Sequence, residues 1–205
     1  MKHVPIRLLT ACLFLASAAA ASAGEWQVDP AHSSAQFSVR HMMISTVRGQ
    51  FQKMTGTVNL NEADVTKSAI DITIDAASID TREPKRDGHL RSPDFFDTEK
   101  FPTLTFKSTK IEKAGDGQYS VTGDLTMHGV THPVTLAVDG PSAPAKNPWG
   151  MTVRGVSATG SLSRKDWGLT WNKALEAGGV LVGDEIKLQI DAELAEKPAA
   201  APAAK

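Results

Sequence analysis

Residues 119–139 read YSVTGDLTMHGVTHPVTLAVD, and this stretch decides the fold class. From Tyr119 to Met127, large apolar residues or glycine alternate with polar residues. A period of two is typical of a β-strand with one buried face. His128 and Gly129 interrupt the alternation as a hairpin turn would, and it resumes at Val134. The stretch therefore predicts two antiparallel strands joined by a tight turn.

The same alternation recurs over much of residues 24–195, at 35–39, 70–76, 104–106 and 186–194. We count about eight strands of roughly 6–12 residues, with a second hairpin turn at residues 114–117. A flat sheet of this size would leave long edges exposed, so closure into an antiparallel barrel or a tight sandwich is favoured. The apolar phase changes near Gln52 and near Gly155, which predicts a β-bulge at each place.

Residues 78–100 do not alternate and are rich in charged side chains. They predict a short helical insertion around residues 82–97, with Thr81 or Glu83 near its start and Pro84 in the first turn. A connection of this length in an all-β domain is a plug over the barrel end or a lid that contacts a ligand. Both interpretations stay open.

The two ends of the chain differ from the domain between them. Residues 1–23 have the positive start, the short apolar run and the final Ala-Ser-Ala of a secretory signal peptide, with predicted cleavage after Ala23. A lipoprotein signal ending at Cys12 is the alternative. Residues 196–205 are rich in Ala and Pro and predict a disordered tail. We expect a domain over residues 24–195, a periplasmic location and no stable membrane insertion.

Composition excludes several classes of function. The 22 Lys and Arg residues balance 23 Asp and Glu residues, whereas a general nucleic-acid binder needs a basic surface. A single Cys excludes sites built from several thiolates. The sequence contains neither the H-E-x-x-H motif of metalloproteases nor the G-x-S-x-G motif of hydrolases. We therefore expect no catalytic residue, no metal and no cofactor.

Nine short motifs are spread along the domain: residues 26–33 (WQVDPAHS), 37–41 (FSVRH), 49–51 (GQF), 78–81 (SIDT), 86–97 (RDGHLRSPDFFD), 101–102 (FP), 123–131 (GDLTMHGVT), 163–169 (SRKDWGL) and 182–186 (VGDEI). In their order and spacing, these motifs resemble those of the YceI-like, polyisoprenoid-binding family. The resemblance implies an eight-stranded antiparallel, lipocalin-like barrel with a small helical insertion. It also implies a long apolar cavity that holds an isoprenoid chain or a similar amphiphile.

The strand phases and the resemblance together predict the ligand-contacting residues. The apolar lining should come from inward faces, the mouth from aromatic residues, and the polar contacts from His41, which shares the inward phase of Phe37, and from the insertion. His41 as a hydrogen-bonded core residue, and Arg86 with Asp87 as an ion pair that pins the insertion, are the structural alternatives. The predicted site residues are Phe37, Val39, His41, Phe51, Ile72, Ile74, Arg86, His89, Phe95, Phe96, Phe106, Leu136, Trp171, Leu188 and Ile190.

The predicted function is non-catalytic binding, transport or storage of a long-chain amphiphile: a polyisoprenoid, an isoprenoid quinone or a fatty-acid-like lipid. The alternative is a structural or stress-protective periplasmic protein without a dedicated ligand. A solid core would favour this alternative, and a cavity would favour the carrier. Besides the lipid, the one partner considered is a second copy of the chain, because the sequence does not decide between a monomer and a homodimer.

Overall fold

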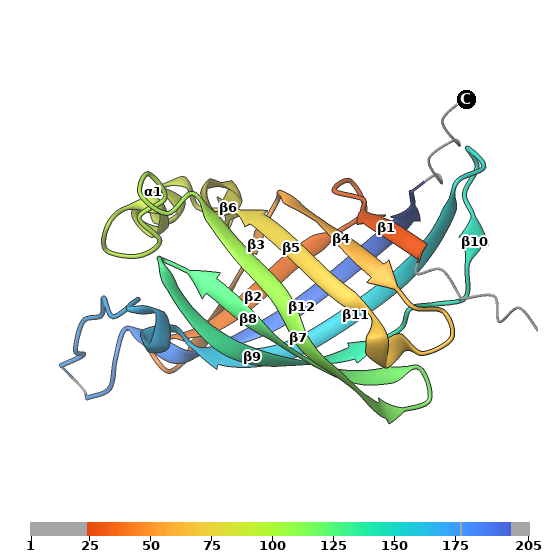
Figure 1. Ribbon diagram of the computed structural model, residues 1–205. Helices are drawn as coiled ribbons and strands as arrows, with labels where there is room; N and C mark the ends of the chain where they lie inside the picture. Colours follow the sequence, from red (N-terminus) through yellow and green to blue (C-terminus); the bar gives the residue numbers. More distant parts are fainter. Residues whose placement is uncertain (1–23, 177, 198–205) are drawn as a thin grey trace, which may run out of the picture.

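A computed structural model describes residues 24–176 and 178–197, which form a twisted antiparallel β-barrel with one short α-helix at one end (Figure 1). The predicted signal peptide and most of the predicted tail lie outside the described residues. The strands are β1 (Gly24–Val28), β2 (Ser34–His41), β3 (Ser45–Phe51), β4 (Met54–Leu60), β5 (Ala69–Asp75), β6 (Ile79–Asp80), β7 (Thr103–Gly115), β8 (Gln118–Met127), β9 (Val130–Asp139), β10 (Ala145–Lys146), β11 (Thr152–Ser163) and β12 (Val182–Glu196). The helices are η1 (Val65–Lys67), η2 (Ala76–Ser78), α1 (Pro84–Arg91) and η3 (Arg164–Trp167).

The barrel closes because β12 pairs with β11 on one side and with both β1 and β2 on the other. The strands β1 and β2 form one interrupted strand, and β3 and β4 form its partner, since β2 pairs with β3 and β1 with β4. Counted this way, the barrel has 8 antiparallel strands, which confirms the predicted fold. Closure leaves short edges only, so the sheet offers little template for aggregation.

The two predicted bulges are wrong. The phase change near Gln52 is the interruption between β3 and β4, where the Gln52 amide donates to the Ser78 carbonyl at 3.1 Å. Near Gly155, β11 keeps an unbroken register with β12 from Val153 to Ser163. The apolar residues Trp149 and Met151 precede this strand and are exposed, so their phase says nothing about the core. Register shifts occur instead in the β7–β8 and β12–β2 pairs.

The two hairpin turns with positive φ at both central positions differ in sequence. His128 and Gly129, with φ of 52° and 75°, join β8 to β9 as predicted. Met42 and Met43, with φ of 50° and 63°, are the first two of the three residues that join β2 to β3, and the Ile44 amide donates to the His41 carbonyl at 3.1 Å. Asn-Gly is the preferred pair for such a turn. A residue other than glycine in this conformation costs about 1–2 kcal/mol, so Met42 and Met43 are strained.

The helical insertion is shorter than predicted. The helix α1 spans Pro84–Arg91, with Glu83 as N-cap and Pro84 in the first turn, as the sequence indicated. The Glu83 carboxylate accepts hydrogen bonds from the amides of Lys85 and Arg86. The chain then continues in turns, and Figure 1 places all of this at one end of the barrel. We call residues 76–101, together with 164–176 and 178–181, the cap.

Two apolar clusters fill the barrel. One lies beneath the cap and includes Phe51, Ile79 and Trp167, and the other lies around Trp26, Met54 and Leu194 towards the opposite end. Trp167 is buried and its ring N–H donates to the Leu125 carbonyl at 3.0 Å, which holds η3 against the barrel wall. In the described part of the chain, no helix has the length and apolar character needed to cross a membrane.

Candidate functional site

The inside of the barrel holds a cavity of about 300 Å³, which matches the lower end of the range for ligand pockets. Its lining is almost wholly apolar, and Arg164 is the one charged residue that contributes to it in the described chain. Eleven of the predicted site residues line this cavity: Phe37, Val39, Phe51, Ile72, Ile74, Phe95, Phe96, Phe106, Leu136, Leu188 and Ile190.

The strand period explains why these side chains converge. Ile70, Ile72 and Ile74 alternate along β5 with polar residues that face outwards, and all three line the cavity. The strand β12 contributes its even-numbered residues from Ile186 to Leu194 in the same way. Successive side chains of a strand point to opposite faces, so the alternating sequence gives an apolar interior and a polar exterior.

The cap closes one end of the cavity with aromatic rings. Phe51 packs on Phe37 and on Phe96, with ring centroids 5.8 and 5.6 Å apart. Phe95 packs on Trp171 at 5.3 Å. Because Phe95 and Phe96 also line the cavity, the insertion both covers the end of the barrel and forms part of the cavity wall.

Four predicted site residues do not line the cavity: His41, Arg86, His89 and Trp171. His41 is the last residue of β2, where it pairs with Ser45 and Val182. It therefore lies at the end of the barrel, and its side chain does not reach the cavity lining. The ring of His89 packs edge-on against Trp171 at 4.8 Å and bonds Asp94 at 2.9 Å. The rings of His89 and Trp171 also pack on Phe95, at 5.0 and 5.3 Å, and so support the cap.

Arg86 and Asp87 do not form the predicted ion pair. The buried Asp87 carboxylate accepts hydrogen bonds from the Thr81 amide at 2.9 Å and the Thr81 hydroxyl at 2.5 Å. Arg86 Nε donates to the same hydroxyl oxygen at 2.7 Å. Thr81 therefore bridges the two charged residues. Arg86 and Asp87 do not pair with each other because each bonds Thr81, a residue that precedes the helix.

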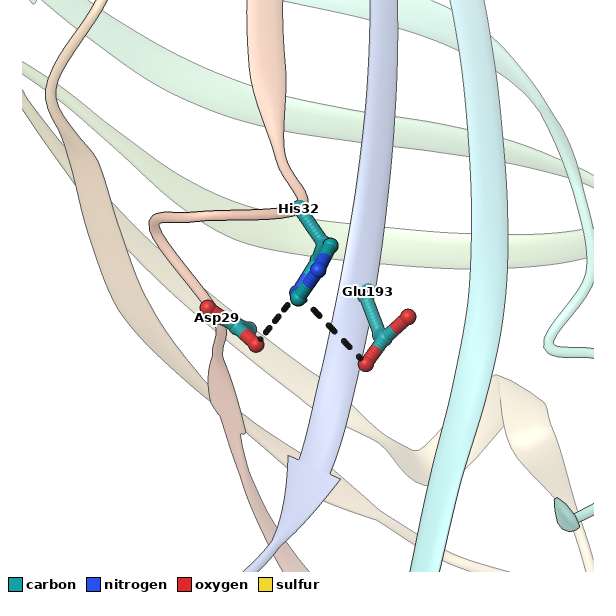
Figure 2. Close-up of side chains that lie close together, drawn as sticks. All are labelled: Asp29, His32 and Glu193. Atoms are coloured by element: carbon teal, nitrogen blue, oxygen red, sulfur yellow. Dashed lines mark hydrogen bonds and ion pairs between the residues drawn. The ribbon is translucent and has the colours of Figure 1, made fainter. Parts of the chain in front are cut away.

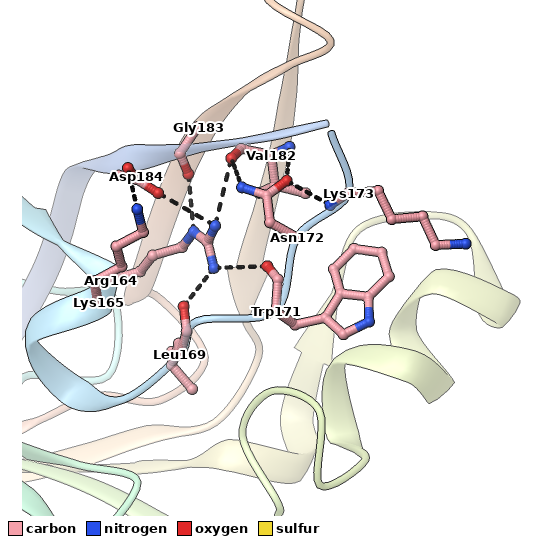
Figure 3. A network of polar contacts seen from close by, with 9 residues as sticks. All are labelled: Arg164, Lys165, Leu169, Trp171, Asn172, Lys173, Val182, Gly183 and Asp184. Atoms are coloured by element: carbon pink, nitrogen blue, oxygen red, sulfur yellow. Dashed lines mark hydrogen bonds and ion pairs between the residues drawn. The ribbon is translucent and has the colours of Figure 1, made fainter. Parts of the chain in front are cut away.

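The guanidinium of Arg164 joins cap residues 164–176 to the start of β12, as Figure 3 shows. Its Nε donates to the Gly183 carbonyl at 2.9 Å, and its Nη1 donates to the carbonyls of Leu169 and Trp171. Its Nη2 lies 3.3 Å from a carboxylate oxygen of Asp184, which also pairs with Lys165 at 2.8 Å. Burial lowers the pKa of the Arg164 guanidinium, and the charge of Asp184 opposes that shift.

Sequence reasoning missed the role of Arg164, although residues 163–169 were noted as a motif. Its side chain is 3% exposed, and its donors are taken by backbone carbonyls or Asp184. Arg164 continues the even-numbered phase of Ala158 and Leu162, which line the cavity, and this phase is the signal that could have identified it. The structure shows that its charge is committed to holding the cap rather than free for a ligand.

One further cluster, outside the cavity, joins Asp29, His32 and Glu193 (Figure 2). The His32 ring Nδ1 lies 2.8 Å from Asp29 Oδ2 and 4.0 Å from Glu193 Oε1. The His32–Asp29 hydrogen bond lowers the pKa of the Asp29 carboxyl and raises that of His32. His32 thus closes the turn between β1 and β2 through its ring nitrogen.

Comparisons with known proteins agree with this architecture. A family model described as YceI-like domain matches residues 26–194. A UPF0312 protein of Staphylococcus aureus strain MSSA476 is 37% identical over 166 residues, which cover 80% of this chain and 94% of that protein. A UPF0312 protein of Vibrio cholerae strain N16961 is 38% identical over 152 residues, which cover 73% and 80%.

Solved structures show the same fold. The Campylobacter jejuni YCEI protein is 32% identical, with a TM-score of 0.65 over 77% of this chain and 90% of its own. BcnA of Burkholderia cenocepacia is 25% identical, with a TM-score of 0.69 over 81% and 98%. A Saccharophagus degradans domain described as polyisoprenoid-binding is 16% identical, with a TM-score of 0.59 over 86% and 99%, which shows likeness of fold alone.

Proposed function

The chain belongs to the YceI-like domain family, and on that premise we propose that it binds one long-chain amphiphile, without covalent chemistry, in the cavity of its barrel. The main support for this proposal is the apolar cavity of about 300 Å³. An acyl or prenyl chain placed there gains about 25 cal/mol for each Å² removed from water. Because the domain from Saccharophagus degradans is described as polyisoprenoid-binding, a polyisoprenoid is the first ligand to test, followed by an isoprenoid quinone and a fatty acid.

The cavity favours a carrier over a purely structural role. Protein interiors are packed to nearly crystalline density, and empty space forfeits dispersion contacts. A barrel that only had to be rigid would fill this space with larger side chains. Ala35, Ala158 and Ala192 instead leave the interior open at three strands.

Binding without turnover is the second part of the proposal. Arg164 is the one charged side chain in the described lining, and its N–H groups already face carbonyls and Asp184. A general acid or base must reach the reacting atoms of the substrate. No carboxylate or imidazole among the described residues lines this cavity, so the barrel is built to hold a chain rather than to react with it.

We also propose that the chain is exported to the periplasm, where it transports or stores its lipid. The support is the signal sequence of residues 1–23. Intact-mass analysis of protein from the native host should show a chain that starts at Gly24. A diacylglyceryl group on Cys12 would contradict this.

The direct test is extraction. Protein isolated from its native host, extracted with organic solvent and analysed by mass spectrometry, should release one prenyl or acyl lipid per chain. The same protein stripped of lipid should bind a fluorescent acyl probe. Absence of extracted lipid together with absence of probe binding would overturn the proposal.

A steric block sharpens that test. Ala35 lines the cavity on β2, so Ala35→Trp should fill it and abolish probe binding while the protein stays folded. The matched control is Ala137→Trp, on the exposed outer face of β9. Gly123 is unsuitable for a steric block of this kind, because a Cβ there would lie 2.4 Å from the Phe106 ring and 2.5 Å from the Lys107 carbonyl. Equal probe binding by both Trp variants would place the ligand elsewhere.

A further inference from the structure

The tip of the β2–β3 hairpin exposes three consecutive large apolar side chains. Met42, Met43 and Ile44, here called the apolar tip, are 40%, 58% and 77% exposed. Single exposed apolar residues are ordinary, whereas a contiguous group marks a surface that binds something.

The turn holds these residues in a strained conformation. Met42 and Met43 both have positive φ in a three-residue connection, since His41 pairs with Ser45. Asn-Gly is the pair preferred where two successive turn residues have positive φ. A polar pair such as Asn-Gly would adopt this backbone conformation with less strain and would expose less apolar surface. Strain and exposure at the same two residues point to a role for the side chains outside the folded domain.

The apolar tip is continuous with the cap end of the cavity. The Met42 amide donates to the Leu181 carbonyl at 2.8 Å, and a Cβ at Gly179 would lie 3.4 Å from Met43 Cγ. The tip is therefore braced by the cap segment before β12. Val39 and Val182, next to it on β2 and β12, line the cavity. A lipid leaving past these residues would emerge beside the tip.

Basic residues lie on the strands next to the tip and on the loop before β12. Arg40, Arg48, Lys173 and Lys187 are exposed, and none has an acidic partner within 4.0 Å in the described chain. Arg40 donates to the Met43 carbonyl at 2.8 Å, and the register of β12, β2 and β3 puts Lys187 and Arg48 in one row with Ser38. The acidic residues nearby are Glu176, Glu185 and Asp184, of which Asp184 is taken by Arg164 and Lys165.

We propose that the apolar tip and these basic residues dock the cap end of the barrel on a lipid bilayer with anionic head groups, from which the cavity takes its lipid. The inference rests on the proposed function and names the membrane as its partner. Apolar side chains at the head-group boundary, flanked by Lys and Arg, are the combination that binds such surfaces.

The opposite end of the barrel supplies a matched control. Trp149 and Met151, 77% and 48% exposed, lie at the hairpin between β10 and β11. Figure 1 shows β10 at the end away from α1. These residues do not line the cavity. If exposed apolar area alone caused membrane binding, either end of the barrel would bind. Variants at the two ends can therefore be compared directly.

The experiment is flotation of the full chain with vesicles of phosphatidylcholine alone or mixed with phosphatidylglycerol. The wild type should float with the anionic vesicles, less so as salt rises. Met43→Asp with Ile44→Asp should reduce the bound fraction about tenfold or more, whereas Trp149→Asp should leave it unchanged. Equal flotation of the tip variant and the wild type, no flotation of the wild type, or loss caused by Trp149→Asp would overturn the proposal.

Two further measurements separate docking from other effects. An acyl probe supplied in solution should bind the tip variant as well as the wild type. If neither the wild type nor the tip variant binds the probe, the proposed function is wrong. The flotation result still tests membrane docking independently. Met42→Asn with Met43→Gly should relax the turn, raise the melting temperature and weaken flotation. A tip that only shapes the turn would gain stability and float unchanged, which would contradict docking.

Discussion

The wall of the barrel and its cap are stabilised by opposite chemistry. The wall is alternating sequence whose inward side chains, such as Ile72 and Ile190, are apolar and surround the cavity. The cap contains little regular structure and is held by buried polar groups, Asp87 and Arg164 among them. The wall can therefore tolerate changes in volume, whereas the cap depends on individual hydrogen bonds. The predictions below test this difference, from the largest expected effect to the smallest.

The largest loss is expected in the cap. Arg164→Met keeps most of the side-chain volume but leaves the carbonyls of Leu169, Trp171 and Gly183 without their donor. We expect a loss of about 3–5 kcal/mol in the free energy of unfolding. Urea denaturation measures it, and hydrogen exchange should rise first in residues 168–183.

The matched control is Lys165→Met, because Lys165 pairs with the same Asp184 from the surface. An exposed ion pair contributes less than about 1 kcal/mol. Similar losses for the two variants would show that the cap is held by charge at its surface rather than by the buried guanidinium.

Truncation of the wall should cost less. Ile190 lines the cavity on β12 and packs against the cluster around Trp26. Ile190→Ala should cost about 2–3 kcal/mol, the lower part of the range for such a deletion, because the site already borders open space. The enlarged cavity should accept a bulkier probe. A cost above that of Arg164→Met would reverse the comparison between wall and cap.

The Thr81 bridge tests the cap on a smaller scale. Asp87→Ala removes the acceptor of the Thr81 amide and hydroxyl and should cost about 1–3 kcal/mol. Asp87→Asn keeps an acceptor oxygen and should cost less. Arg86→Ala should have the mildest effect, because Asp87 keeps both Thr81 donors. Thermal melts of the three variants give the order, and Arg86→Ala as the most damaging would contradict it.

The smallest effect is expected at the exposed turn of the wall. His32 has a raised pKa, so its contribution to stability is full below its unfolded pKa and is lost as pH rises through the folded value. Asp29 has a lowered pKa, so its contribution is lost as pH falls through its own folded value. His32→Gln should remove the first dependence. Urea midpoints of both proteins from pH 4 to 8 check this, together with the NMR titration of the His32 ring.

The wall was more predictable from sequence than the cap, where the start of α1 was predicted but the polar contacts were not. The difference has a physical reason. Period-two alternation is repeated along each strand, so Ile72, Leu136 and Leu188 could be assigned to the inside before any coordinates. In the cap, polar side chains choose partners far apart in sequence: Arg164 reaches Gly183, and Arg91 reaches the carbonyl of Ile79. No local pattern encodes such pairs, which is why Arg164 was overlooked. Arg86 and Asp87 were wrongly paired for another reason, since each bonds Thr81, five and six residues earlier.

The long strand β12 has a consequence for how the chain folds. It pairs with both β1 and β2, so Trp26 meets Glu196 and Ala35 meets Ile190. These contacts join residues far apart in sequence, and their formation must wait until the last strand has left the ribosome. Until then the nascent barrel has open edges and no closed interior. If the chain is exported as we propose, its barrel would therefore close only after the whole domain has been synthesised.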